Sequence, residues 1–241
     1  MEVLKFKLSG KSAFFKMPEV NTYYYFTYGN VHKVALLGIF GAVLGYDGYQ
    51  QQEKEQVYPE FYERLKDLAI SIVPKEGSKG YIPKKIQSFN NSVGYASQEA
   101  GGNLIIKQQW LEWPEWEIYV RLDCEEAQKI KEYFLQRKCV YMPYLGSNDH
   151  PANITSVQLL PGDLIQHQEI NRIHSIVPVD ACEFDYDEED VIPYKYQEFL
   201  PMALNPDTNL YELKKMVYTN FPVLNHSADV VRVGEKNIIF Y

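Results

Sequence analysis

The chain has 241 residues, 46% of them hydrophobic, which is enough for one large or two small domains with a packed core. A formal net charge of −8 argues against general affinity for nucleic acid. The charge is uneven, because residues 1–107 carry 13 Lys and Arg against 10 Asp and Glu, while the remainder carries 11 against 22. We therefore expect any anionic partner to meet the first half of the chain.

Two further classes are excluded by local pattern. The uncharged run from Val34 to Leu44 is eleven residues long, whereas a membrane-spanning helix needs about 20, so no membrane partner is expected. Neither a P-loop pattern nor a G-x-G-x-x-G fingerprint is present, so nucleotide hydrolysis has no support. Three cysteines without metal-ligand spacing and without a preceding secretory leader indicate a reducing, cytoplasmic setting.

In chain order, residues 3–8 alternate apolar and polar side chains and predict a first strand. Residues 32–45 predict a buried helix, because Gly38, Gly41 and Gly45 recur at steps of three and four and leave one side open to close packing. Residues 57–73 predict a second helix with an apolar stripe facing the core.

Residues 74–103 form a long connection with five glycines, four lysines and little periodicity. Strand-like segments follow it at 104–111 and 116–122, which predicts a hairpin protruding from a sheet. A third helix is predicted at about 124–138, with Asp123 and Glu126 as a capping box at its start.

This order of strand, helix, hairpin strands and helix predicts an α+β, ferredoxin-like (RRM-like) fold with helices on one face of an antiparallel sheet. The helix at 57–73 is an insertion in that scheme. We expect a first domain at 1–154, with the protruding thumb at about 75–105. The proline-punctuated residues 155–241 predict a small β-rich C-terminal region.

Two stretches, KFKLSGKSAFFKMPEVNTYYYFTYGNVHKVALLGIFGAVLG (5–45) and YMPYLGSNDHPANI (141–154), resemble the fifth family of CRISPR-associated proteins, in particular its type I-B branch. The resemblance covers about residues 2–154. It implies a RAMP-superfamily subunit of a type I Cascade complex, whose thumb and loop 11–33 hold the 5′ handle of the guide RNA (crRNA). Such a subunit caps the filament of backbone subunits and touches the large PAM-reading subunit, and it meets target DNA only indirectly.

Candidate RNA-binding residues follow from what a single-stranded handle offers, namely phosphates and unstacked bases. Five lysines could neutralise phosphates: Lys11, Lys16, Lys33, Lys84 and Lys85. Three rings could stack on bases: Phe15, Tyr25 and Tyr28. The start of the helix at His32 could bind a phosphate, and Asn90 and Asn91 could bind base edges at the thumb tip. The plain alternative is that each tyrosine is a packing residue and each lysine is merely solvated.

We expect no catalysis and no metal or cofactor. One branch of the family cleaves precursor guide RNA without metal by acid–base chemistry, but no histidine lies between residues 33 and 149, where the thumb is expected. Two alternatives stay open: a metal-independent endoribonuclease that processes precursor crRNA, and a protein-interaction module that does not contact RNA.

Overall fold

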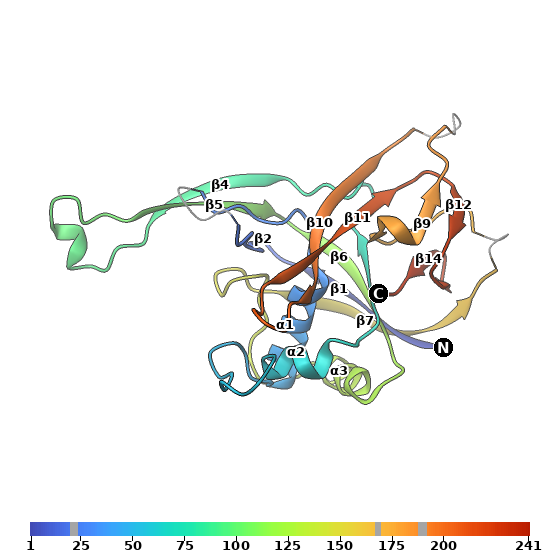
Figure 1. The fold of residues 1–241 in the computed structure, drawn as a ribbon, viewed down its shortest axis with the longest axis horizontal. Coiled ribbons are helices and arrows are strands. Elements are labelled where there is room, and N and C mark those ends of the chain that lie inside the picture. Colours follow the sequence, from blue (N-terminus) through green and yellow to red (C-terminus); the bar gives the residue numbers. More distant parts are fainter. Residues whose placement is uncertain (20–23, 167–169, 188–191) are drawn as a thin grey trace.

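The computed structural model describes residues 1–19, 24–166, 170–187 and 192–241, and it shows a compact body from which one long hairpin projects (Figure 1). The main sheet has six antiparallel strands in the order β14–β13–β7–β1–β6–β3. These strands are β1 (Glu2–Ser9), β3 (Ile70–Pro74), β6 (Glu115–Arg121), β7 (Asn153–Leu164), β13 (Val230–Val233) and β14 (Lys236–Ile239).

The topology is ferredoxin-like, as predicted. In chain order β1, α1 (Lys33–Leu44), β3, β6, α3 (Glu125–Leu135) and β7 make a βαββαβ unit, and its strands lie in the order β7–β1–β6–β3. Alternate residues of β1 face the helices, so Phe6 packs edge-on against Phe40 of α1 and Phe134 of α3 at centroid distances of 6.1 and 4.8 Å.

The first predicted helix is confirmed. The side chain of His32 caps α1 by accepting the backbone N–H of Ala35, and Gly45 ends the helix in the left-handed conformation. A Cβ on Gly41 would lie 2.6 Å from the Cβ of Phe61, so this glycine does allow the close approach of α2 (Glu60–Leu65). Gly38, by contrast, has open space around it.

The predicted helix at 57–73 is wrong over its second half. Helix α2 ends at Leu65, and residues 70–74 form β3, whose five residues are all buried. This strand pairs with β6 in the position that the ferredoxin-like scheme requires, so the segment is part of the fold and no insertion. Val57, at the start of the predicted stripe, is 54% exposed.

The third predicted helix is present as α3, and its buried face consists of Ala127, Ile130 and Phe134. Its predicted capping box is wrong, because the N-cap residue is Cys124 and no side chain caps the helix there. The carboxylate of Asp123 binds the guanidinium of Arg121 instead.

The projecting hairpin consists of β4 (Lys84–Asn90) and β5 (Ile105–Glu112), and the short β2 (Ser12–Ala13) pairs with the root of β5. The distal loop contains the 3₁₀ turn η1 (Ala96–Gln98). The hairpin leaves the body between β3 and β6. It overlaps the range of about 75–105 predicted for the thumb but continues to residue 112.

The C-terminal part is β-rich. It adds a sheet of β10 (Lys195–Leu204), β11 (Tyr211–Thr219) and β8 (Val177–Pro178), a 3₁₀ turn η3 (Val179–Ala181), and the pair β9 (Cys182–Phe184) and β12 (Val223–His226). However, β7 runs through the predicted division at residue 154, and β13 and β14 extend the main sheet. The two predicted regions therefore share one sheet. Among the described residues, no helix is long and apolar enough to cross a bilayer.

Candidate nucleic-acid interface

The N-terminal connection and the hairpin, which lie far apart in sequence, form one ribbon. The backbone N–H of Tyr25 donates to the carbonyl of Lys107 (2.9 Å), and the N–H of Gln109 donates to the carbonyl of Tyr25 (2.9 Å). Residues 24–27 therefore lie beside β5 on the edge opposite β4. We call β4, β5 and residues 24–27 the thumb ribbon. It brings together the two segments from which RNA contacts were predicted.

One face of the thumb ribbon presents Tyr24, Phe26 and Lys107. The two rings are 39% and 37% exposed and lie nearly parallel, with centroids 6.4 Å apart and an interplanar angle of 23°. The Nζ atom of Lys107 lies 5.1 Å from the centroid of Tyr24. Exposed rings beside an ammonium group are the combination that single-stranded nucleic acid uses, because bases stack and phosphates pair with the cation.

The opposite face carries two more cation–ring pairs, because successive strand residues point to opposite sides. Lys16 lies over Tyr25 at 4.5 Å, and Lys85 lies over Trp110 at 5.9 Å. Lys85 is also 3.5 Å from a carboxylate oxygen of Glu112. The structure thus places the predicted Lys16, Tyr25 and Lys85 on one face.

Three predicted contact residues are core residues and need correction. Phe15, Tyr28 and His32 are 2%, 0% and 2% exposed, and the ring of His32 lies edge-on to the other two. Burial lowers the pKa of His32 to about 3, so the side chain is neutral at the start of α1. Because all three rings are buried, they cannot stack on bases in this structure. The ring of His32 is also occupied as the helix cap, so it does not bind a phosphate.

Two predicted lysines are half-buried. The ammonium group of Lys84 donates to the carbonyl of Thr27 (3.2 Å), and burial lowers its pKa although Glu198 opposes the shift. Burial likewise lowers the pKa of Lys33, against the attraction of Asp67. Lys84 therefore ties the root of the thumb to residue 27, whereas Lys33 belongs to the first turn of α1.

The predicted asparagines do not lie at the thumb tip. Asn90 ends β4, where its amide group binds Asn103 (3.1 Å) and its oxygen accepts from the backbone and hydroxyl of Ser92. It closes the mouth of the distal loop, which continues to residue 104. Asn91 is exposed beside it, and Lys11 is exposed before β2, where its carbonyl accepts the N–H of Trp113. Residues 20–23 of the predicted loop 11–33 lie outside the described residues.

Sequence reasoning missed Tyr24, Phe26, Lys107 and Trp110. No local signal singles out Tyr24 and Phe26, because residues 23–26 are four aromatic residues in a row. Sequence reasoning also missed His150 at the root of the thumb, because no sequence motif indicates that the fold brings this residue there. His150 is 1% exposed, accepts or donates at 2.7 Å with the hydroxyl of Ser12, and lies edge-on to Trp110 at 4.6 Å.

The face of the main sheet away from the helices is occupied by its own ion pairs. Lys5 and Lys236 both bind the carboxylate of Glu117, which also accepts the hydroxyl of Tyr119. Burial would raise the pKa of Glu117, but the hydrogen bonds from the lysines outweigh it and lower the pKa to about 2. Because these lysines are already paired, the thumb ribbon is the better candidate for an RNA contact than this sheet face.

No protein-family model and no curated protein matches the chain. Among solved structures, it is similar to a chain of a CRISPR RNA-guided surveillance complex, with 11% identity and a TM-score of 0.56 over 94% of this chain and 93% of that one. The two chains share a fold. The predicted likeness to CRISPR-associated proteins is confirmed at that level. A weaker similarity is to a CRISPR protein from Archaeoglobus fulgidus, with 11% identity and a TM-score of 0.46 over 99% of this chain and 98% of that one. Another is to a chain of the type III-B Cmr-beta complex, with 9% identity and a TM-score of 0.49 over 92% of this chain and 86% of that one.

Proposed function

We propose that this chain is a non-catalytic subunit of a CRISPR effector ribonucleoprotein of the Cascade type, in which the thumb ribbon holds the 5′ handle of the guide RNA. The fold shared with a surveillance-complex chain supports the setting. In this proposal the subunit caps the filament of backbone subunits and contacts the large PAM-reading subunit, as the resemblance of residues 2–154 implies.

The observation that carries the RNA contact is the thumb ribbon itself. Tyr24 and Phe26 each keep more than a third of their surface exposed. They lie parallel, beside Lys107, on a backbone fixed by hydrogen bonds to β5. A flexible single strand can therefore stack on rings that are ordered before it binds, which lowers the entropy lost on binding.

The experiment measures binding of a labelled single-stranded handle RNA by the assembled complex and by the free chain at several salt concentrations. Tyr24→Ala should weaken binding by about 5- to 150-fold, since a stacked base contributes about 1–3 kcal/mol. Lys107→Ala should lower the slope of log affinity against log salt by about 0.7, the value for one phosphate on a single strand.

Lys195→Ala is the matched control, because Lys195 makes a similar pair with Tyr186 (3.7 Å) away from the thumb. It should change neither affinity nor slope. Equal effects of Lys107→Ala and Lys195→Ala would refute the thumb-ribbon contact.

Catalysis is tested separately by incubating the chain with its cognate repeat RNA. We expect no cleavage. Specific cleavage lost in His150→Ala, with Lys195→Ala still active, would assign the chain to the nucleases instead.

A further inference from the structure

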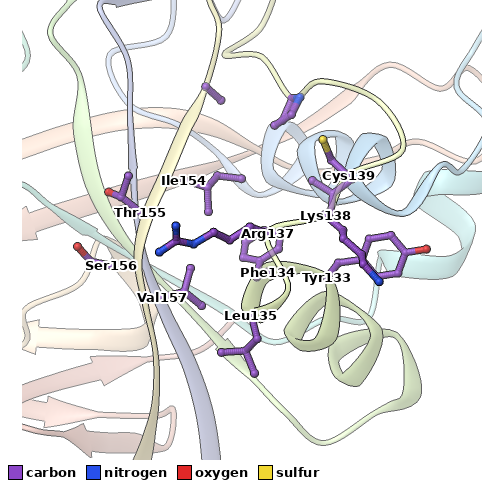
Figure 2. Close-up of a pocket in the computed structure, with 13 residues that line it drawn as sticks. Tyr133, Phe134, Leu135, Arg137, Lys138, Cys139, Ile154, Thr155, Ser156 and Val157 are labelled. Atoms are coloured by element: carbon purple, nitrogen blue, oxygen red, sulfur yellow. The ribbon is translucent and has the colours of Figure 1, made fainter.

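A pocket of about 530 Å³ lies between the end of α3 and the first residues of β7, on the helical side of the main sheet (Figure 2). Its walls include Phe134 of α3 and Ile154 and Val157 of β7. The side chain of Arg137 extends from the helix end across the pocket toward β7. The volume is in the range of pockets that hold a ligand or an anchoring side chain. The thumb projects from another part of the body.

Arg137 stands where a helix ordinarily has glycine. The N–H of Arg137 donates to the carbonyl of Phe134, and the N–H of Lys138 donates to that of Tyr133, which is the Schellman pattern at a helix end. This pattern puts Arg137 in the left-handed region (φ 53°), where a side chain is strained. Ser156, on the β7 side of the same pocket, has φ 53° as well. Two of the five described non-glycine residues with a positive φ therefore lie on this one pocket.

The pocket is basic and its charges are unpaired. Within the part of the chain that the structure describes, neither Arg137 nor Lys138 forms an ion pair, although most other lysines and arginines near α3 do. The two cations therefore stand beside apolar walls without a carboxylate. A ligand that supplies one carboxylate and one apolar group would complement them.

Exposed apolar side chains flank the pocket-lining residues Lys138, Cys139 and Pro143 in the sequence. Leu135, Val140, Tyr141 and Met142 are 49%, 53%, 58% and 76% exposed. The backbone N–H groups of Val140 and Tyr141 donate to the carbonyls of Val43 and Ala42 at the end of α1 (2.9 and 3.0 Å), so this segment is anchored to the helix. Exposed apolar side chains that flank a pocket are typical of a protein–protein contact, and a nucleic-acid surface would carry more cations.

We propose that this pocket docks a segment of a partner protein in which an aspartate or glutamate lies next to a large apolar side chain. The carboxylate binds Arg137 and Lys138, and the apolar side chain enters between Phe134, Ile154 and Val157. This site is separate from the thumb ribbon, and it goes beyond the RNA contact proposed above.

Two cysteines allow a direct test in the complex isolated from cells. Cys139 lines the pocket, whereas Cys124 is exposed at the other end of α3, and both are free thiols. N-ethylmaleimide should label Cys139 at least tenfold more slowly in the complex than in the free chain, with Cys124 much less affected. A zero-length carbodiimide should couple Lys138 to an aspartate or glutamate of another protein, identified by mass spectrometry.

Substitutions test the same contact without relying on labelling. Arg137→Gly should remove the guanidinium and release the strained backbone. The affinity for the partner should therefore fall at least tenfold, while the melting temperature of the free chain should be no lower than that of the native chain. Arg137→Glu should also lose the partner, and Lys54→Glu, an exposed charge reversal outside the pocket, should keep it.

Unchanged labelling of Cys139 in the complex, together with an intact complex for Arg137→Gly, would overturn the proposal. Protection of Cys139 in the free chain by RNA alone, with no other protein present, would overturn it in favour of RNA. Handle-RNA binding is measured in parallel. A chain that binds the handle RNA in the complex but leaves Cys139 fully accessible would refute the docking site and leave the proposed RNA contact standing.

Discussion

A half-buried carboxylate of the C-terminal sheet holds the segment that leads from the thumb ribbon to α1. Glu198 of β10 accepts the backbone N–H of Gly29 with both oxygens (2.8 and 3.0 Å) and the hydroxyl of Tyr196 (2.6 Å). Gly29 follows residues 24–27 of the thumb ribbon by two positions. We predict that Glu198→Ala destabilises the fold and also weakens handle-RNA binding, although Glu198 is not expected to contact RNA.

The size of the effect follows from the two donors that would lose their acceptor. An unsatisfied buried donor costs about 1–3 kcal/mol. Burial raises the pKa of Glu198, so part of this loss is offset by removing a carboxylate that is expensive to keep charged. We expect a net loss of about 2–4 kcal/mol, which lowers the melting temperature of a chain of this length by about 5–15 °C.

Thermal unfolding at neutral pH measures this change, with Glu183→Ala, an exposed carboxylate on β9, as the control. Glu198→Gln should recover much of the loss, because the amide keeps an acceptor for Gly29. Since the folded-state pKa of Glu198 is raised, native stability falls as pH rises above the usual carboxyl pKa. Glu198→Gln lacks this pH-dependent loss. The stability of Glu198→Gln relative to the native chain should therefore be higher at pH 7 than at pH 4. A melting temperature for Glu198→Ala equal to that of Glu183→Ala would refute the reasoning.

Three further changes test other parts of the fold by thermal unfolding. Gly146→Ala should be severely destabilising, by about 3 kcal/mol or more, because its Cβ would lie 1.9 Å from the carbonyl oxygen of Phe14 at φ 90°. Gly29→Ala should cost less, because the clash, at 2.2 Å, is with the movable hydroxyl of Tyr196; an equal cost would contradict this. The lowered pKa of Glu117 stabilises the fold above about pH 4.5, and this contribution is lost as pH falls toward 2. The native chain should therefore be more stable than Glu117→Gln at neutral pH and lose this extra stability in acid. A stability difference that does not change with pH would exclude this contribution of Glu117.

The candidate site was only partly accessible from sequence. The resemblance implied that loop 11–33 and the thumb act together, and hydrogen bonds between Tyr25 and β5 join these two segments. Which rings face outward could not be predicted, because it depends on strand pairing with residues about 80 positions away. That pairing exposes Tyr24 and Phe26, whereas the packing of the loop against α1 and β11 buries Tyr28.

Local signals determined the elements whose periodicity and end residues agree. Three features can be predicted from local sequence alone, because the pattern of each element matches its burial. They are the alternation of β6, the glycine at the end of α1 and the apolar face of α3. Residues 57–73 show the limit. Their apolar spacing suits a helix, but only pairing with β6 makes residues 70–74 a strand, and hydrogen bonds between distant segments leave no trace in local sequence. The same holds for the pocket, because its two walls, at the end of α3 and on β7, are distant in sequence and come together only in the folded chain.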